Sequence, residues 1–136
     1  MSPRRMSAAA VMTLIVSLAA AGCSSPAAGL SDLERDATTD HPVPVEVSDD
    51  ALADLDVDTI RWVGEHDGTD LWLASGAEDH DACLLIYPDA TDWVVACGVG
   101  PMQSSTGAGR TFAVVPDGAT APEGFEAVSR NVFASS

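Results

Sequence analysis

Lysine is absent from this sequence, and its six basic residues are all arginines. Aspartate and glutamate together number 21, so the formal net charge is −15 at pH 7. A nucleic-acid-binding protein needs a basic surface to neutralise phosphates, and this composition disfavours one. Electrostatic docking onto an anionic lipid surface is disfavoured for the same reason. We therefore expect no nucleic-acid partner.

The chain is also too short for two ordinary domains, because 136 residues match the size of one. Aromatic side chains are scarce, with three tryptophans, one tyrosine and three phenylalanines. Apolar residues nevertheless make up 46% of the chain, which is enough to build a hydrophobic core. Disorder of the whole chain is therefore not expected.

A long hydrophobic run is missing as well. The uncharged stretch of residues 8–21 follows Arg4 and Arg5. As a helix it would measure about 21 Å, whereas the hydrocarbon core is about 30 Å thick. A basic start, a short apolar stretch and small residues before a cleavage site are typical of a secretory signal peptide. We predict a signal peptide over residues 1–22, exported by general secretion or, as an alternative, by the twin-arginine route.

The most specific motif is the end of this segment, where residues 18–25 read LAAAGCSS. It resembles the lipobox of bacterial lipoproteins, in which small residues lead directly into a cysteine, although Ala20 stands where that family prefers leucine. The resemblance implies that the Cys23 thiol receives a diacylglycerol and that cleavage makes Cys23 the first residue. The alternative is an ordinary signal peptide with a cysteine near the cut by chance.

The resemblance also implies a place for the protein. Two acyl chains bind a bilayer durably, so the domain would be held on the outer face of the cytoplasmic membrane through Cys23. The mature chain would carry 21 acids against four arginines, a net charge of −17. This composition, rich in alanine and acids and free of lysine, is similar to that of small lipoproteins of high-GC Gram-positive bacteria.

Residues 23–47 have no sustained apolar period and include Pro42 and Pro44. This sequence pattern predicts a flexible tether, with a short helix at residues 31–37 as the alternative. We expect the folded domain over residues 48–136. It starts with one or two turns of helix at residues 48–55, where Ser48 is a suitable N-cap.

Strand signals dominate the rest of the domain. Apolar and β-branched runs cover residues 59–63, 71–74, 83–87, 93–97 and 111–115, and residues 125–133 hold one bent strand or two short ones. Asp67-Gly68 predicts a tight hairpin that sets Trp62 opposite Leu73. Residues 98–110 are expected to form a long loop. The runs at 83–87 and 93–97 are expected to be central strands.

Together these signals predict an all-β fold. We expect a small antiparallel meander of five or six strands that closes into a barrel or a sandwich, with at most one short N-terminal helix.

Cys83 and Cys97 remain once Cys23 is assigned to the lipid. A turn centred on Ala90 pairs position 83 with position 97 on adjacent antiparallel strands. Directly opposed cysteines lie near the separation that a disulfide requires, and export favours oxidation. We predict a Cys83–Cys97 disulfide; two free buried thiols or a reactive or metal-binding pair are the alternatives.

Metal sites find weak support. Asp54, Asp56, Asp58 and Glu65 have the spacing of calcium ligands in an EF-hand loop. Thr59, however, stands where that loop needs glycine, so a solvated acidic face or a looser cation site fits better. Zinc binding by His66 and His80 has no supporting spacing. We expect no metal or other cofactor.

Trp62, Trp72 and Trp93 fall on neighbouring expected strands, where they could fill the core or form a binding face. Two functions remain open. The first is a non-enzymatic binding or interaction module of the cell envelope, with a protein or ligand as its partner. The second is a small envelope hydrolase or a metal-dependent protein. The absence of a recognisable catalytic motif favours the first.

Overall fold

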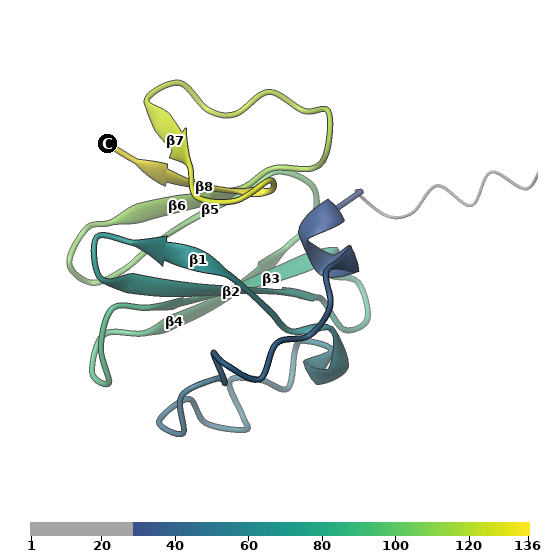
Figure 1. Cartoon of the computed structure of the whole chain (residues 1–136), viewed down its shortest axis with the longest axis vertical. Helices are drawn as coiled ribbons and strands as arrows, with labels where there is room; N and C mark the ends of the chain where they lie inside the picture. The colour runs from purple at the N-terminus through teal and green to yellow at the C-terminus, as the bar shows by residue number, and fades with distance from the viewer. Residues whose placement is uncertain (1–28) are drawn as a thin grey trace, which may run out of the picture.

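The computed structural model describes residues 29–136. The expected signal peptide and Cys23 lie outside the described residues. Two four-stranded antiparallel sheets pack face to face (Figure 1). The first sheet contains β1 (Arg61–His66), β2 (Thr69–Ser75), β3 (Ala82–Tyr87) and β4 (Val94–Gly98). The second contains β5 (Met102–Ser105), β6 (Thr111–Val114), β7 (Phe125–Ala127) and β8 (Val132–Ser135). Two 3-10 helices, η1 (Ser31–Glu34) and η2 (Val57–Thr59), complete the described elements.

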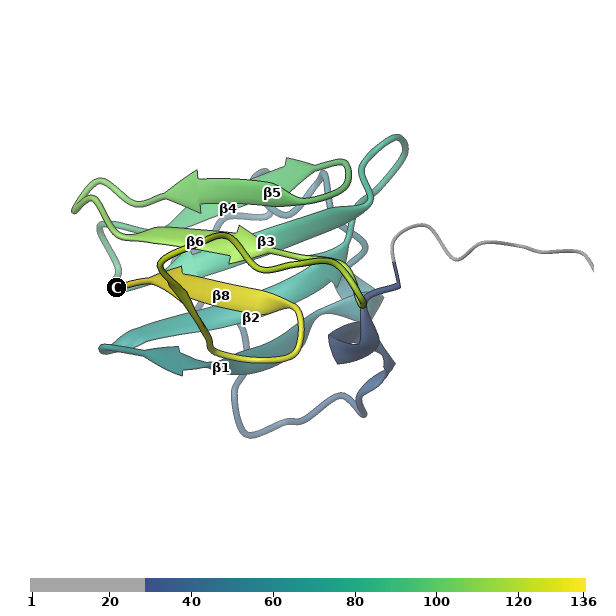
Figure 2. The same cartoon turned by 90° about the horizontal axis from the view of Figure 1, so that it is seen from above.

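The all-β prediction is confirmed, and the strand count is corrected from five or six to eight. The first sheet is the expected meander, in the order β1-β2-β3-β4. The second is not, because β8 lies between β6 and β7 in the order β5-β6-β8-β7. The sheets stay separate, so the structure is an open two-layer sandwich and not a closed barrel (Figures 1 and 2).

The main hydrophobic core lies between the two sheets. Its largest side chain is Phe112 of β6, which shares the cluster with leucines from β2 and β3. The buried members of this core are Leu30, Val63, Leu71, Leu73, Ala82, Leu84, Ile86, Phe112, Val114, Val132 and Ala134. On β2, β6 and β8 the members alternate along the strand, as expected for side chains that point inward at every second position. Strand β3 is buried except at its last residue, Tyr87, as expected for a central strand, whereas β4 is a partly exposed edge strand.

The first hairpin turns where the sequence predicts it. Asp67 and Gly68 both have positive φ, at 48° and 77°, as a tight two-residue turn requires. Farther from the turn, the pairing of β1 with β2 differs by one residue from the expected register. An irregularity between Trp62 and Gly64 shifts the register, so Trp62 faces Trp72 and not Leu73. Such a bulge inserts one unpaired residue into a strand and bends it.

Glycine is required at this bulge. Gly64 has a φ of 148°, and a Cβ built there would lie 2.9 Å from Cγ1 of Val128. We expect Gly64→Ala to lower the free energy of unfolding by about 2 kcal/mol, measured by urea denaturation. Val128→Ala relieves the contact and leaves the backbone strain, so the double variant should remain less stable than Val128→Ala alone. Equal stability of those two variants would contradict the strain argument.

The expected loop of residues 98–110 contains a strand that the sequence did not reveal. β5 carries polar residues, but it pairs with β6 from Met102↔Val114 to Ser105↔Thr111. The turn after it is also held in place, because the Asp92 carboxylate accepts hydrogen bonds from the amides of Gly107 and Ala108 at 3.0 and 3.3 Å. For residues 125–133 we expected one bent strand or two short ones, and the structure has two, β7 and β8.

The part of the expected tether that the structure describes packs against the sandwich. Leu30 is 8% exposed and joins the main core, and Val47 is 5% exposed in a second cluster outside the first sheet. The packed domain therefore begins no later than Gly29, well before residue 48. The reason is long-range burial, which a local polar pattern does not reveal. The expected helix at residues 48–55 is instead a series of hydrogen-bonded turns.

Candidate functional site

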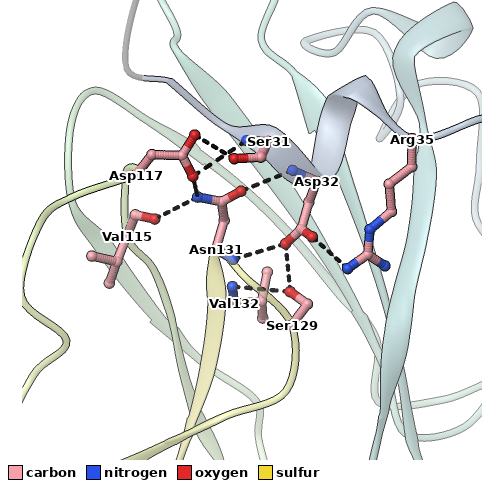
Figure 3. Close-up of polar contacts among 8 residues, drawn as sticks. All are labelled: Ser31, Asp32, Arg35, Val115, Asp117, Ser129, Asn131 and Val132. Atoms are coloured by element: carbon pink, nitrogen blue, oxygen red, sulfur yellow. Dashed lines mark hydrogen bonds and ion pairs between the residues drawn. The ribbon is translucent and has the colours of Figure 1, made fainter.

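A buried polar network joins the N-terminal segment to the second sheet (Figure 3). Asp32 of η1 and Asn131, just before β8, are 1% and 0% exposed. The Asp32 amide donates to Oδ1 of Asn131 at 3.0 Å, and the Asn131 amide donates to Oδ2 of Asp32 at 2.8 Å. The Asn131 side chain also donates to the carbonyl of Val115 at 2.9 Å. This reciprocal pair fixes η1 at one end of the sandwich.

The charge of Asp32 is compensated on both oxygens. Its Oδ1 forms an ion pair with Nη2 of Arg35 at 2.7 Å, and its Oδ2 accepts the Ser129 hydroxyl at 2.6 Å. A buried carboxylate is tolerated when it is paired and hydrogen-bonded in this way. The network therefore stabilises the fold and does not leave a carboxylate available for a ligand.

Asp117 extends the network at the surface. Its carboxylate accepts hydrogen bonds from Ser31 and from the Asn131 side chain. These bonds, led by the Ser31 hydroxyl, hold the pKa of Asp117 below its ordinary value. Its contribution to stability is therefore complete above the unfolded-state pKa and is lost as the pH falls through the lowered folded-state pKa. The Asp117 amide also donates to the Gly29 carbonyl at 2.7 Å.

The predicted disulfide is confirmed. Cys83 of β3 is opposite Cys97 of β4, and the two are bonded with their Cα atoms 4.0 Å apart. Cys83 is fully buried beside Leu55 and Ala74, on the outer face of the first sheet. The bond therefore fastens the edge strand β4 to the interior strand β3.

The three tryptophans lie together in the cluster outside the first sheet. Trp72 is 4% exposed and donates from Nε1 to the carbonyl of His41 at 2.9 Å. Trp62 donates to Asp70 at 3.0 Å, and its ring stacks on the exposed His41 ring with centroids 3.8 Å apart. Trp93 is partly buried against the same cluster. Trp72 therefore has a core position, and the chain's own residues cover part of the expected face.

The acidic candidates are not brought together. Asp56 caps η2 by accepting the Asp58 amide at 3.1 Å, while Glu65 lies along β1. Within residues 29–136, no group of three or more histidine, cysteine, aspartate or glutamate side chains is arranged to hold a metal ion. The chain enters β1 directly after Thr59 and Ile60, and this extended path separates Glu65 from the aspartates.

His66 and His80 line two different cavities. A cavity of about 340 Å³ outside the first sheet is lined by Asp50, Asp54, His80 and Trp93, among others. His66 instead lines a cavity of about 240 Å³ at the end of the sandwich opposite η1, near the marked C-terminus (Figure 1). His66 and His80 therefore do not share a site.

The end cavity also contains Arg110, which sequence patterns left in a loop. Its lining residues are His66, Asp67, Ala108, Gly109, Arg110, Thr111, Phe112, Ala134, Ser135 and Ser136. They come from the β1–β2 turn, the approach to β6 and the end of β8. No local motif joins these three segments, so only the fold reveals the cavity.

No family model, curated protein or solved structure matches this chain. No relative therefore assigns a role to any of these residues. In the part of the chain that the structure describes, no helix is long and apolar enough to span a bilayer.

Proposed function

We propose that the chain is a lipid-anchored protein of the outer face of the cytoplasmic membrane, with Cys23 as its anchor. The lipobox-like sequence of residues 18–25 carries this proposal. The Cys83–Cys97 disulfide supports it, because such bonds persist in oxidising compartments outside the cytoplasm. The anchored part is the β-sandwich, which begins no later than Gly29.

We propose further that the sandwich is a non-enzymatic binding module of the cell envelope. The end cavity supports this role, since it collects polar side chains from three separate segments around one space. The buried network around Asp32 and the disulfide are structural by contrast, because their groups are engaged with each other. Binding is therefore assigned to the surface and not to these internal contacts.

The anchor is tested by Cys23→Ser in the native host. Without the thiol there is no thioether to the diacylglycerol, so we expect the protein to move from the membrane fraction to the soluble or secreted fraction. Ser24→Ala is the matched control and should leave membrane attachment unchanged. Mass spectrometry of the wild-type protein should find an acylated Cys23 as the first residue. A wild-type N-terminus without acyl mass would contradict the proposal.

A further inference from the structure

Arg110 is held at the end cavity by neutral groups. Its Nη1 donates to the carbonyl of Asp67 and, at 2.9 Å, to the hydroxyl of Thr69. Thr69 is fully buried, so its hydroxyl is a fixed acceptor. These two bonds connect the β1–β2 hairpin of one sheet with the approach to β6 of the other. They orient the guanidinium plane without neutralising its charge.

The rest of the guanidinium is available. Throughout residues 29–136, no protein acceptor is hydrogen-bonded to Nε or Nη2 of Arg110, and no carboxylate lies within ion-pair distance of it. Nε and Nη2 form one edge of the guanidinium, whose parallel N–H groups match two oxygens of a carboxylate or phosphate. Among the described residues, Arg110 is thus an oriented arginine at a cavity without a carboxylate partner.

The other lining groups are mixed, because the Asp67 carboxylate lies among them beside His66. His66 lines the cavity from β1, with its ring perpendicular to that of the buried Phe112 and its Nε2 3.4 Å from Oδ2 of Asp67. Ser135 and Ser136 also line the cavity, and the Ser136 hydroxyl donates to the carbonyl of Gly124 at 3.1 Å. At about 240 Å³ the space is smaller than the ~300–1,000 Å³ of sites for drug-sized ligands. It therefore suits a small acid better than a dinucleotide or a folded polymer.

We propose that the end cavity binds an oxyanion, the carboxylate or phosphate group of a small organic molecule. The Nε and Nη2 edge of Arg110 is its bidentate donor, and His66, whose Nε2 lies beside the Asp67 carboxylate, is a second contact for the ligand. This inference rests on the proposed binding function and names its ligand class. It does not depend on acylation of Cys23.

The test is an NMR titration of the full chain in a non-ionic detergent, at constant ionic strength. Acetate and inorganic phosphate are the two probes, and the arginine Nε–H signals are observed. We expect a saturable shift of the Arg110 signal for at least one probe. The probe with the larger affinity distinguishes a carboxylate site from a phosphate site. Linear, non-saturating shifts with both probes would overturn the proposal.

Three variants assign the binding to this cavity. Arg110→Lys keeps the charge and loses the bidentate edge, so affinity should fall by about tenfold or more. Arg130→Gln removes an exposed arginine outside the cavity lining and should leave affinity within about twofold. His66→Gln leaves the contacts of Arg110 intact and should weaken binding, which keeps the test valid if Arg110→Lys fails to fold. Unchanged affinity in folded Arg110→Lys, or in His66→Gln where Arg110→Lys does not fold, would overturn the assignment.

The outcome is separable from that of the anchoring experiment. Membrane fractionation of Cys23→Ser reports on the lipid, whereas the titration reports on the cavity alone. If the protein remains attached to membranes but binds neither probe, the proposed ligand class is contradicted and the proposed lipid anchor is not.

Discussion

Replacing both disulfide cysteines with alanine, as Cys83→Ala/Cys97→Ala, is expected to lower the melting temperature by roughly 12–24 °C. The bond closes a loop with a sequence separation of 14, and a loop of about 15 residues is worth about 3 kcal/mol in the chain-entropy account. In a domain of this size each kcal/mol shifts the melting temperature by about 4–8 °C. The loss should be large because β4 is an edge strand that has only β3 as its partner.

Chemical reduction gives the matched control for this experiment. Wild-type protein unfolded in the presence of a thiol reductant should melt near the temperature of the double variant, and the variant should not respond to the reductant. Far-UV circular dichroism before heating would establish that the variant starts folded. A double variant that melts within about 4 °C of the oxidised wild-type protein would show that the bond adds little to stability.

Asn131→Ala is expected to lower the free energy of unfolding by about 3–5 kcal/mol. The substitution removes the partners of two buried groups, the Asp32 amide and the Val115 carbonyl. Each buried group left without a hydrogen bond costs about 1–3 kcal/mol, and the truncated side chain adds a small cavity. The surface contact with Asp117 is also lost, but water can replace it.

Urea denaturation monitored by tryptophan fluorescence measures this loss. Glu126→Gln on the exposed face of β7 is the matched control and should change stability by less than about 0.5 kcal/mol. Hydrogen exchange of the Asp32 amide gives a local readout, since that amide should exchange much faster in Asn131→Ala. A loss below about 1 kcal/mol would mean that the network contributes little to the attachment of η1.

The features that the sequence predicts correctly are those determined by short turns. The Asp67-Gly68 turn and the cysteine register depend on short-range rules, because strand partners on both sides of a turn are set by counting residues. The same counting fails beyond Val63, where the bulge at Gly64 shifts Trp62 by one position. Gly64 lies against Val128, more than sixty residues farther along the chain, and a sequence window around the hairpin does not contain that neighbour.

The polar contacts were harder to predict. Asp32 lies in a charged run typical of an exposed linker, yet its partner Asn131 is 99 residues farther along the chain. Strand β5 was missed for a related reason, because its backbone pairs with β6 while its side chains carry no apolar pattern. Arg110 becomes noticeable only when the β1–β2 hairpin lies beside it. In each case the determining neighbour is distant in sequence.

The attachment of Gly29 and η1 to the sandwich determines how far the domain could reach from a bilayer. Five residues lie between Cys23 and Gly29, and the six Cα-to-Cα steps span at most about 20 Å in a fully extended chain. An acyl anchor would therefore keep the sandwich within about its own width of the lipid headgroups, with the η1 end facing them. The end cavity, at the opposite end, would then face away from the lipid headgroups.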